Sequence, residues 1–138
     1  MSVRGKVALI TGAGTGIGKA TAERMSADGA HVIAGIIGDK ERTAASDFTQ
    51  RILDVRLQSD WDAALADCRE QFGGIDILVN NAGLLIEGTA EETDDATWDK
   101  IFDVNLKGLF RGCRAVVPAM RQRGGGAIVN LASIDALN

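Results

Sequence analysis

The sequence predicts an α/β protein with a doubly wound parallel sheet and helices on both of its faces, making three layers. Two observations carry this prediction. Short apolar runs alternate with longer segments in which apolar residues recur at helical spacing, which is typical of strand–helix–strand units. Several apolar runs are nearly continuous, as expected for strands that are buried on both faces. Right-handed crossovers between such strands give the order 3-2-1-4-5.

Five apolar runs are the candidate strands, and the expected sheet is truncated after the fifth. We expect one domain over residues 1–138, because a chain of this length buries enough surface for a single core. The candidate strands are residues 7–10, 31–35, 52–55, 75–80 and 127–131.

The connections between these runs differ in helical character. Apolar spacing predicts helices over residues 15–28, 59–72 and 97–123, with Ser59 as the N-cap of the second. The connection 36–51 is weakly patterned, so we expect at most a brief helix there. Pro118 lies in the last of the long helices and should kink it or mark its last turns.

A glycine-rich segment, Thr11-Gly12-Ala13-Gly14-Thr15-Gly16-Ile17-Gly18, follows the first strand directly and opens the first helix. Glycines there permit a tight turn and a close approach of a pyrophosphate to the backbone. The helix N-terminus then offers free N–H groups and the positive end of its dipole. A purely structural turn is the alternative, but the strand–turn–helix context favours dinucleotide binding.

The glycine spacing is Gly-x-x-x-Gly-x-Gly, and no Lys-Ser/Thr follows, which disfavours a P-loop NTPase. This segment resembles the Thr-Gly-x-x-x-Gly-x-Gly motif of the short-chain dehydrogenase/reductase family. The resemblance implies a Rossmann-like NAD(P)-binding domain. It also implies cofactor contacts through Thr11, Gly12, Thr15, Gly16, Ile17 and Gly18.

Two further segments are similar to family motifs that surround the cofactor. Asn80-Asn81-Ala82-Gly83 after the fourth strand matches Asn-Asn-Ala-Gly, and Asp54-Val55 matches the Asp-Val pair of the third. The resemblance places Asn81, Ala82 and Gly83 along the cofactor path and Asp54 with Val55 at the adenine ring. Taken alone, an Asx-type turn explains either segment locally.

Asn105 and Ser133 are the candidate catalytic residues. Val104-Asn105-Leu106-x-Gly108 resembles the family segment whose Asn holds a water in a proton relay, and Ser133 matches the catalytic serine after the fifth strand. The family's central Tyr-x-x-x-Lys pair has no counterpart, because the sequence contains no tyrosine. We therefore expect the chain alone to be inactive.

Cofactor choice depends on the end of the second strand. Family members that use NAD usually carry an Asp there, whereas Ile36 and Ile37 hold the matching positions. No basic residue replaces them, and Thr15 is also neutral, so we expect NAD in preference to NADP. Asp39 is close enough to reach back, and Lys40 and Arg42 are close enough to reverse the preference.

Composition excludes several other classes of protein. A net charge of −4 and an isoelectric point near 4.9 argue against a nucleic-acid partner, and no apolar stretch is long enough for a membrane span. Cys68 and Cys113 are far apart, so we expect two buried free thiols, no disulfide and no metal site. A cytoplasmic location is the default expectation.

The resemblance implies an NAD(P)-dependent oxidoreductase that transfers a hydride between nicotinamide and a small alcohol or carbonyl substrate. This chain would be its cofactor-binding part, within a homo-oligomer, either a dimer or a tetramer. The alternative is a non-catalytic truncated module that binds a dinucleotide or a partner.

Overall fold

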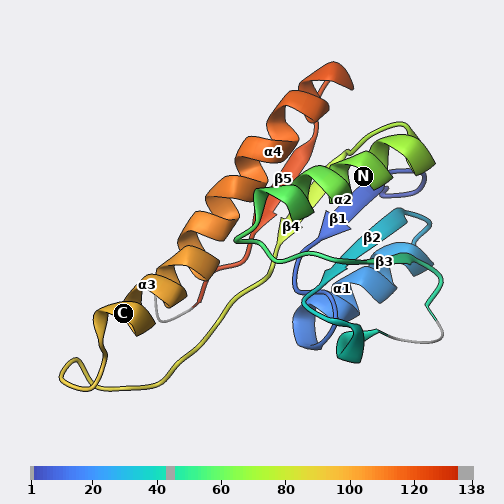
Figure 1. Cartoon of the computed structure of the whole chain (residues 1–138). Coiled ribbons are helices and arrows are strands. Elements are labelled where there is room, and N and C mark those ends of the chain that lie inside the picture. Colours follow the sequence, from blue (N-terminus) through green and yellow to red (C-terminus); the bar gives the residue numbers. More distant parts are fainter. Residues whose placement is uncertain (1, 43–45, 134–138) are drawn as a thin grey trace.

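The computed structural model describes residues 2–42 and 46–133. The elements in chain order are β1 (Val7–Ile10), α1 (Gly16–Ala27), β2 (His31–Ile36), η1 (Asp39–Glu41), β3 (Thr49–Ile52), α2 (Gln58–Phe72), β4 (Ile77–Asn80), α3 (Asp95–Phe102), η2 (Asp103–Gly108), α4 (Leu109–Gln122) and β5 (Ala127–Asn130). The strands form one parallel sheet in the order β3-β2-β1-β4-β5, which confirms the predicted fold (Figure 1).

The central strand β1 is buried on both faces. Val7 and Leu9 belong to a core cluster that includes side chains of α2 and α4, whereas Ala8 and Ile10 belong to a second cluster that includes α1. Because adjacent strand residues point to opposite faces, an apolar run is what a strand between two helical layers needs. The continuous run in the sequence therefore signals this position correctly.

The third strand lies earlier in the chain than predicted. The expected strand was 52–55, but β3 is Thr49–Ile52, paired with Ile33–Ile36 of β2. β3 is an edge strand, and its polar side chains are partly exposed. Such a strand does not need an apolar run, so no apolar run marks it in the sequence. The apolar run that was predicted as the strand follows β3. Its residues Leu53 and Val55 are buried against the core, although they lie outside the strand.

The predicted cap of α2 is also wrong. The helix begins at Gln58 after Leu57, so Ser59 lies within the first turn. Its hydroxyl donates to the Asp60 carboxylate at 3.3 Å and caps no helical N–H. In the connection 36–51 the short 3₁₀ turn η1 is present, as expected, and residues 43–45 lie outside the described part.

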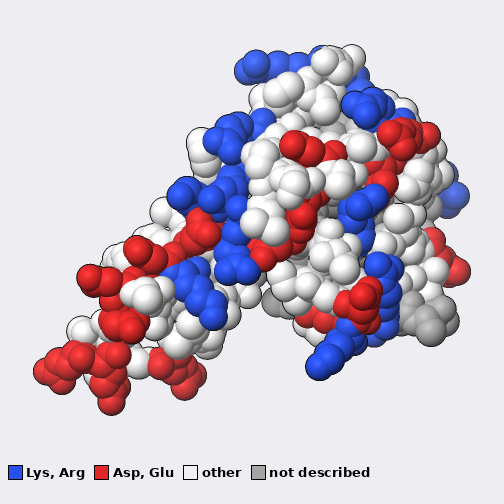
Figure 2. Space-filling model, in the orientation of Figure 1, with Lys and Arg blue, Asp and Glu red and all other residues white. Residues whose placement is uncertain are grey.

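The last long helix has three parts. It begins at Asp95, where the Asp94 carboxylate accepts a hydrogen bond from the Thr97 N–H at 2.8 Å, and it passes through the π-helical stretch η2 into α4. Pro118 lies near the C-terminal end of α4. A loop carries the chain from β4 to α3, far from the sheet (Figure 1). Acidic side chains gather on this projecting part (Figure 2).

One face of the α3–η2–α4 helix exposes large apolar side chains at every fourth position. Trp98, Phe102, Leu106 and Phe110 are each at least 42% exposed, and the first two rings are stacked with centroids 4.5 Å apart. None of the helices in the described part is both long and apolar enough to cross a membrane.

The two cysteines are free, and they differ in burial. Cys68 is fully buried, and this burial raises the pKa of its thiol to about 12. Cys113 on α4 is only half-buried, contrary to expectation, and its sulfur lies 3.6 Å from Asn80 Nδ2.

Candidate dinucleotide-binding site

Hydrogen bonds join the glycine loop (residues 11–18) to the β4 turn (residues 80–83). The buried Thr11 hydroxyl accepts hydrogen bonds from the backbone N–H groups of Asn81 and Ala82 at 3.1 and 3.0 Å. In return, Asn81 Nδ2 donates to the carbonyl oxygens of Thr11 and Gly12, each at 3.0 Å. The side chains of Thr11 and Asn81 thus fix two loops that follow neighbouring strands.

Three glycines of the loop are required for different reasons. A Cβ at Gly12 would lie 2.9 Å from Ala82 Cα, and one at Gly18 would lie 2.3 Å from the Gly12 oxygen and 2.4 Å from Asn81 Nδ2. These two glycines allow the loops to touch. Gly16 has a φ of +53°, and a Cβ there would meet nothing within 4 Å. It therefore provides a left-handed turn beside open space.

The open space is a cavity of about 650 Å³ at the carboxyl ends of β1 to β4. The N-terminus of α1 lies beside it, and the Thr15 side chain makes no capping hydrogen bond. The first-turn amides are consequently left to an incoming anion. The cavity is lined by Gly12, Thr15, Gly16, Ile17, Ile37, Glu41, Leu53, Asp54, Val55, Arg56, Asn81, Ala82, Gly83, Leu84, Lys100 and Val104.

Asp54 and Arg56 form an ion pair at the rim of the cavity. Arg56 Nε lies 2.9 Å from Asp54 Oδ1, and Arg56 Nη2 lies 2.5 Å from Oδ2. The hydrogen bonds from Arg56 lower the pKa of the Asp54 carboxyl below its ordinary value. Next to this pair, Val55 packs where Gly108 of η2 has no side chain, since a Cβ there would lie 2.6 Å from Val55 Cγ2.

Asn105 holds the segment that follows the β4 turn. Its Oδ1 accepts from the Leu84 N–H at 2.7 Å, and its Nδ2 donates to the Leu84 carbonyl at 2.9 Å. The backbone of this one residue therefore supplies hydrogen-bond partners for both the oxygen and the nitrogen of the Asn105 amide. The side chain lies on the π-helical stretch η2.

Ser133 lies at the carboxyl edge of the sheet, after β5, and is exposed. The segment that leads to Ser133 is held by two asparagines that pair across the neighbouring strands β4 and β5. Asn80 Nδ2 donates to Asn130 Oδ1 at 2.9 Å, and the Leu131 N–H donates to the Asn80 carbonyl at 3.0 Å.

The sequence model of the family described as short chain dehydrogenase matches residues 6–138. The chain belongs to the short-chain dehydrogenase family. It is 43% identical over 138 residues to a 3-alpha-(or 20-beta)-hydroxysteroid dehydrogenase of Mycobacterium tuberculosis, covering 96% of this chain and 53% of that protein. It is 39% identical to the trans-4-hydroxycyclohexanecarboxylate dehydrogenase of Sinomonas cyclohexanicum, with 96% and 56% covered.

Solved structures agree with this membership in the short-chain dehydrogenase family. The ligand-free aldohexose dehydrogenase of Thermoplasma acidophilum superposes with a TM-score of 0.89 at 34% identity, over 97% of this chain and 51% of that one. The chain thus spans about half the length of the relatives that it matches.

In this short-chain dehydrogenase chain, most of the predicted cofactor residues line one cavity. They are Gly12, Thr15, Gly16, Ile17, Asp54, Val55, Asn81, Ala82 and Gly83. Thr11 and Gly18 are buried behind them and hold the loops together. The Ile36 side chain is buried at 1% exposure, and its neighbour Ile37 lines the cavity. Asn105 and Ser133 lie outside the lining.

Ile37 was considered for cofactor choice, but several other lining residues were missed by sequence reasoning, namely Glu41, Leu53, Arg56, Leu84, Lys100 and Val104. Lys100 and Val104 are four residues apart, so they share one side of the α3–η2 helix, but nothing in the sequence shows which side faces the cavity. An acidic residue some distance after a glycine motif is a known sign of dinucleotide binding, and Glu41 fits this pattern.

Proposed function

We propose that this chain binds NAD(P) in the cavity between the glycine loop and the β4 turn. The observation that carries the proposal is the joint made by Thr11 and Asn81, which holds a glycine cradle and a helix N-terminus around one cavity. Backbone N–H groups beside glycines fit a pyrophosphate, because no side chain keeps the phosphate away from them.

The contacts that we assign follow the cavity from the glycine loop outward. Gly12, Thr15, Gly16 and Ile17 face the pyrophosphate, with Thr11 and Gly18 supporting them. Asp54 and Val55 bind at the adenine ring, and Asn81, Ala82 and Gly83 lie along the path toward nicotinamide. We propose NAD as the preferred cofactor, because Thr15 is neutral and Arg42 is engaged with Asp39 at 2.6 Å.

We further propose that the activity is that of an oxidoreductase acting on a small alcohol or carbonyl compound. Bound NAD(P) would accept or supply the hydride. Ser133 would orient the substrate oxygen, and Asn105 would serve a proton relay. The names of the relatives, which include a hydroxysteroid and a hydroxycyclohexanecarboxylate dehydrogenase, support cyclic secondary alcohols as first substrates to test.

A second candidate is a dinucleotide-binding module without chemistry. The observation that favours it is that the candidate catalytic residues Asn105 and Ser133 lie outside the lining of the cavity. A homo-oligomer is proposed under either function, because the apolar face of Trp98, Phe102, Leu106 and Phe110 is exposed. The free cysteines favour a cytoplasmic location.

Titration with NADH tests the cofactor site. In Gly16→Val, a side chain would enter the cavity and strain a left-handed residue, so NADH binding should be lost. Gly5→Val is the matched control, because Gly5 has a similar φ of +72° and open space around it but lies outside the cavity. NADH binding by Gly16→Val as tight as by Gly5→Val would refute the assignment.

A turnover assay on the 138-residue chain tests the second candidate function. The 138-residue chain should bind NADH and yet transfer no hydride with a hydroxysteroid or with trans-4-hydroxycyclohexanecarboxylate. Measurable turnover by this chain would mean that it holds its own proton donor, which the second candidate function excludes.

A further inference from the structure

Glu41 is an acidic side chain that lies against the glycine loop. It ends the 3₁₀ turn after β2 and folds back, so that its Oε2 accepts a hydrogen bond from the Ile37 N–H at 3.1 Å. The side chain is half-buried and lines the cavity with Ile37 and Thr15. Within residues 2–42 and 46–133, its other oxygen, Oε1, takes part in no hydrogen bond.

Gly14 provides the space that Glu41 occupies. A Cβ at Gly14 would lie 2.2 Å from the Oε2 and 2.6 Å from the Cβ of Glu41. Gly14 is not one of the glycines with a positive φ, so its backbone conformation is compatible with alanine. The structure therefore needs a glycine at this position because of its neighbour and not because of the turn.

Asp39 and Arg42, two charged residues close to Glu41 in the sequence, are engaged with each other. Arg42 Nε lies 2.6 Å from Asp39 Oδ1, and its Nη1 donates to the Gln50 carbonyl at 3.4 Å, toward β3. Among the described residues Glu41 forms no ion pair. The residue that reaches back toward the loop is thus Glu41, and Asp39 is turned to Arg42.

We propose that Glu41 determines the choice between NAD and NADP, and that Gly14 is required to hold it in place. This inference rests on the dinucleotide binding proposed above. An acidic side chain about 20 residues after a glycine motif accepts hydrogen bonds from the adenosine ribose. Here the Ile37 N–H fixes one carboxylate oxygen, which leaves Oε1 to accept from a hydroxyl. A 2′-phosphate would instead meet a like charge at short range.

Two different substitutions should therefore produce one effect. Glu41→Gln removes the charge and keeps the shape, whereas Gly14→Ala keeps the charge and displaces the carboxylate. If both act through the same contact, the double variant should change the ratio of affinities no further than either single variant.

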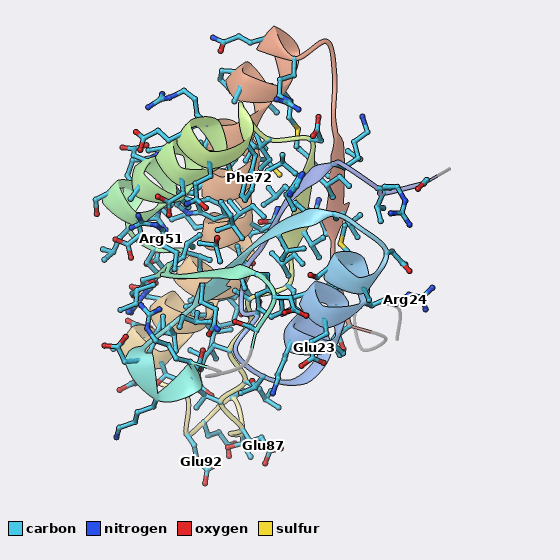
Figure 3. All side chains as sticks on the ribbon, turned by 90° about the vertical axis from the view of Figure 1, so that its right-hand side faces the viewer. Glu23, Arg24, Arg51, Phe72, Glu87 and Glu92 are labelled. Carbon is cyan, nitrogen blue, oxygen red and sulfur yellow. The ribbon has the colours of Figure 1, made fainter. Side chains whose placement is uncertain are left out.

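The experiment is fluorescence titration of the purified protein with NADH and, separately, with NADPH. The wild-type protein should bind NADH about tenfold or more tightly than NADPH. Glu41→Gln, Gly14→Ala and the double variant should each bring the two affinities within about threefold, and added salt should narrow the wild-type ratio. Glu23→Gln is the control, because Glu23 carries the same charge on α1 but lies outside the cavity lining (Figure 3).

The outcomes are distinct. A wild-type protein that binds neither nucleotide overturns the proposed function and this assignment with it. A wild-type protein that binds NADH, with a ratio unchanged in Glu41→Gln, overturns the assignment of Glu41 alone. An equal change in Glu23→Gln would reduce the effect to net charge and would also overturn it. Thermal unfolding of each variant reports whether it is folded during the titration.

Discussion

The neighbouring strands β4 and β5 have paired residues in very different surroundings. Val79 lies opposite Val129, yet Val79 is 5% exposed and Val129 is 50% exposed. β4 lies between two strands and ends in a turn that is bonded to the glycine loop. β5 is the edge of the sheet among the described residues, and most of its side chains are exposed.

This difference separates the residues proposed to bind the cofactor from the serine proposed to take part in the reaction. The residues proposed to hold the cofactor sit on the β1–β4 side, where each loop is fixed by another described loop. Ser133 follows β5, where the described residues leave the surface open. The proposed cofactor-binding half of the site is therefore built from loops that contact one another, whereas Ser133 lies at an exposed edge of the sheet.

The largest expected effect on stability and binding comes from disrupting the contact between the glycine loop and the β4 turn. In Gly18→Ala, the new methyl group would overlap the Gly12 carbonyl and the Asn81 amide, both within 2.4 Å. We expect a loss of about 1–3 kcal/mol in the free energy of unfolding, together with a loss of NADH binding. Urea denaturation measures the first effect and fluorescence titration the second.

Gly38→Ala is the control for this prediction. Gly38 is extended, with a φ of −173°, and a Cβ there would meet nothing within 4 Å. Its stability should stay within about 0.5 kcal/mol of the wild type. Equal stability of Gly18→Ala and Gly38→Ala would contradict the close contact between the loops.

Substitution of the paired valines Val79 and Val129 should have an intermediate effect on stability. It tests the difference in burial between β4 and β5 directly. Val79→Ala removes buried apolar surface and should cost about 1–3 kcal/mol of unfolding free energy. Val129→Ala, at the opposite position, should cost less than about 0.5 kcal/mol. If denaturation of the two variants gives equal losses, then β5 is covered as well as β4 is, for example by a second copy of the chain.

The smallest effect concerns the ion pair at the rim. Because hydrogen bonds from Arg56 lower the pKa of Asp54 in the folded state, their contribution to stability is complete above the unfolded pKa of about 3.9. It is lost as the pH falls through the folded pKa. In Arg56→Ala the pKa of Asp54 should rise toward its ordinary value, as measured by carboxyl carbon NMR.

The stability difference between Arg56→Ala and the wild type should accordingly be present at neutral pH and vanish in acid. Arg69→Ala is the control, since Arg69 pairs only weakly with its neighbour Glu70 at 3.8 Å on an exposed surface. An unchanged pKa of Asp54 in Arg56→Ala would show that the pair is not maintained in solution.

The sequence predicts the central strand β1 and the glycine loop well because both are encoded locally. A continuous apolar run marks β1, and the glycines follow it within a few residues. The predicted position of β3 was wrong for two reasons. Pairing with β2 determines where this strand lies, and an edge strand needs no apolar run to mark it. Glu41 and Lys100 were missed because their distance from the glycine motif in the sequence does not show that they reach the cavity. A 3₁₀ turn places Glu41 there, and the distant helix α3 places Lys100 there.

The most direct test of the central claim is NMR mapping of NADH binding on the 138-residue chain. If the joint between the glycine loop and the β4 turn is the binding site, the amide signals of residues 12–17 and 81–83 should shift as NADH is added, and those of Val129 and its neighbours in β5 should not. Saturable binding that shifts signals of α4 and β5 while leaving residues 12–17 unchanged would contradict the claim.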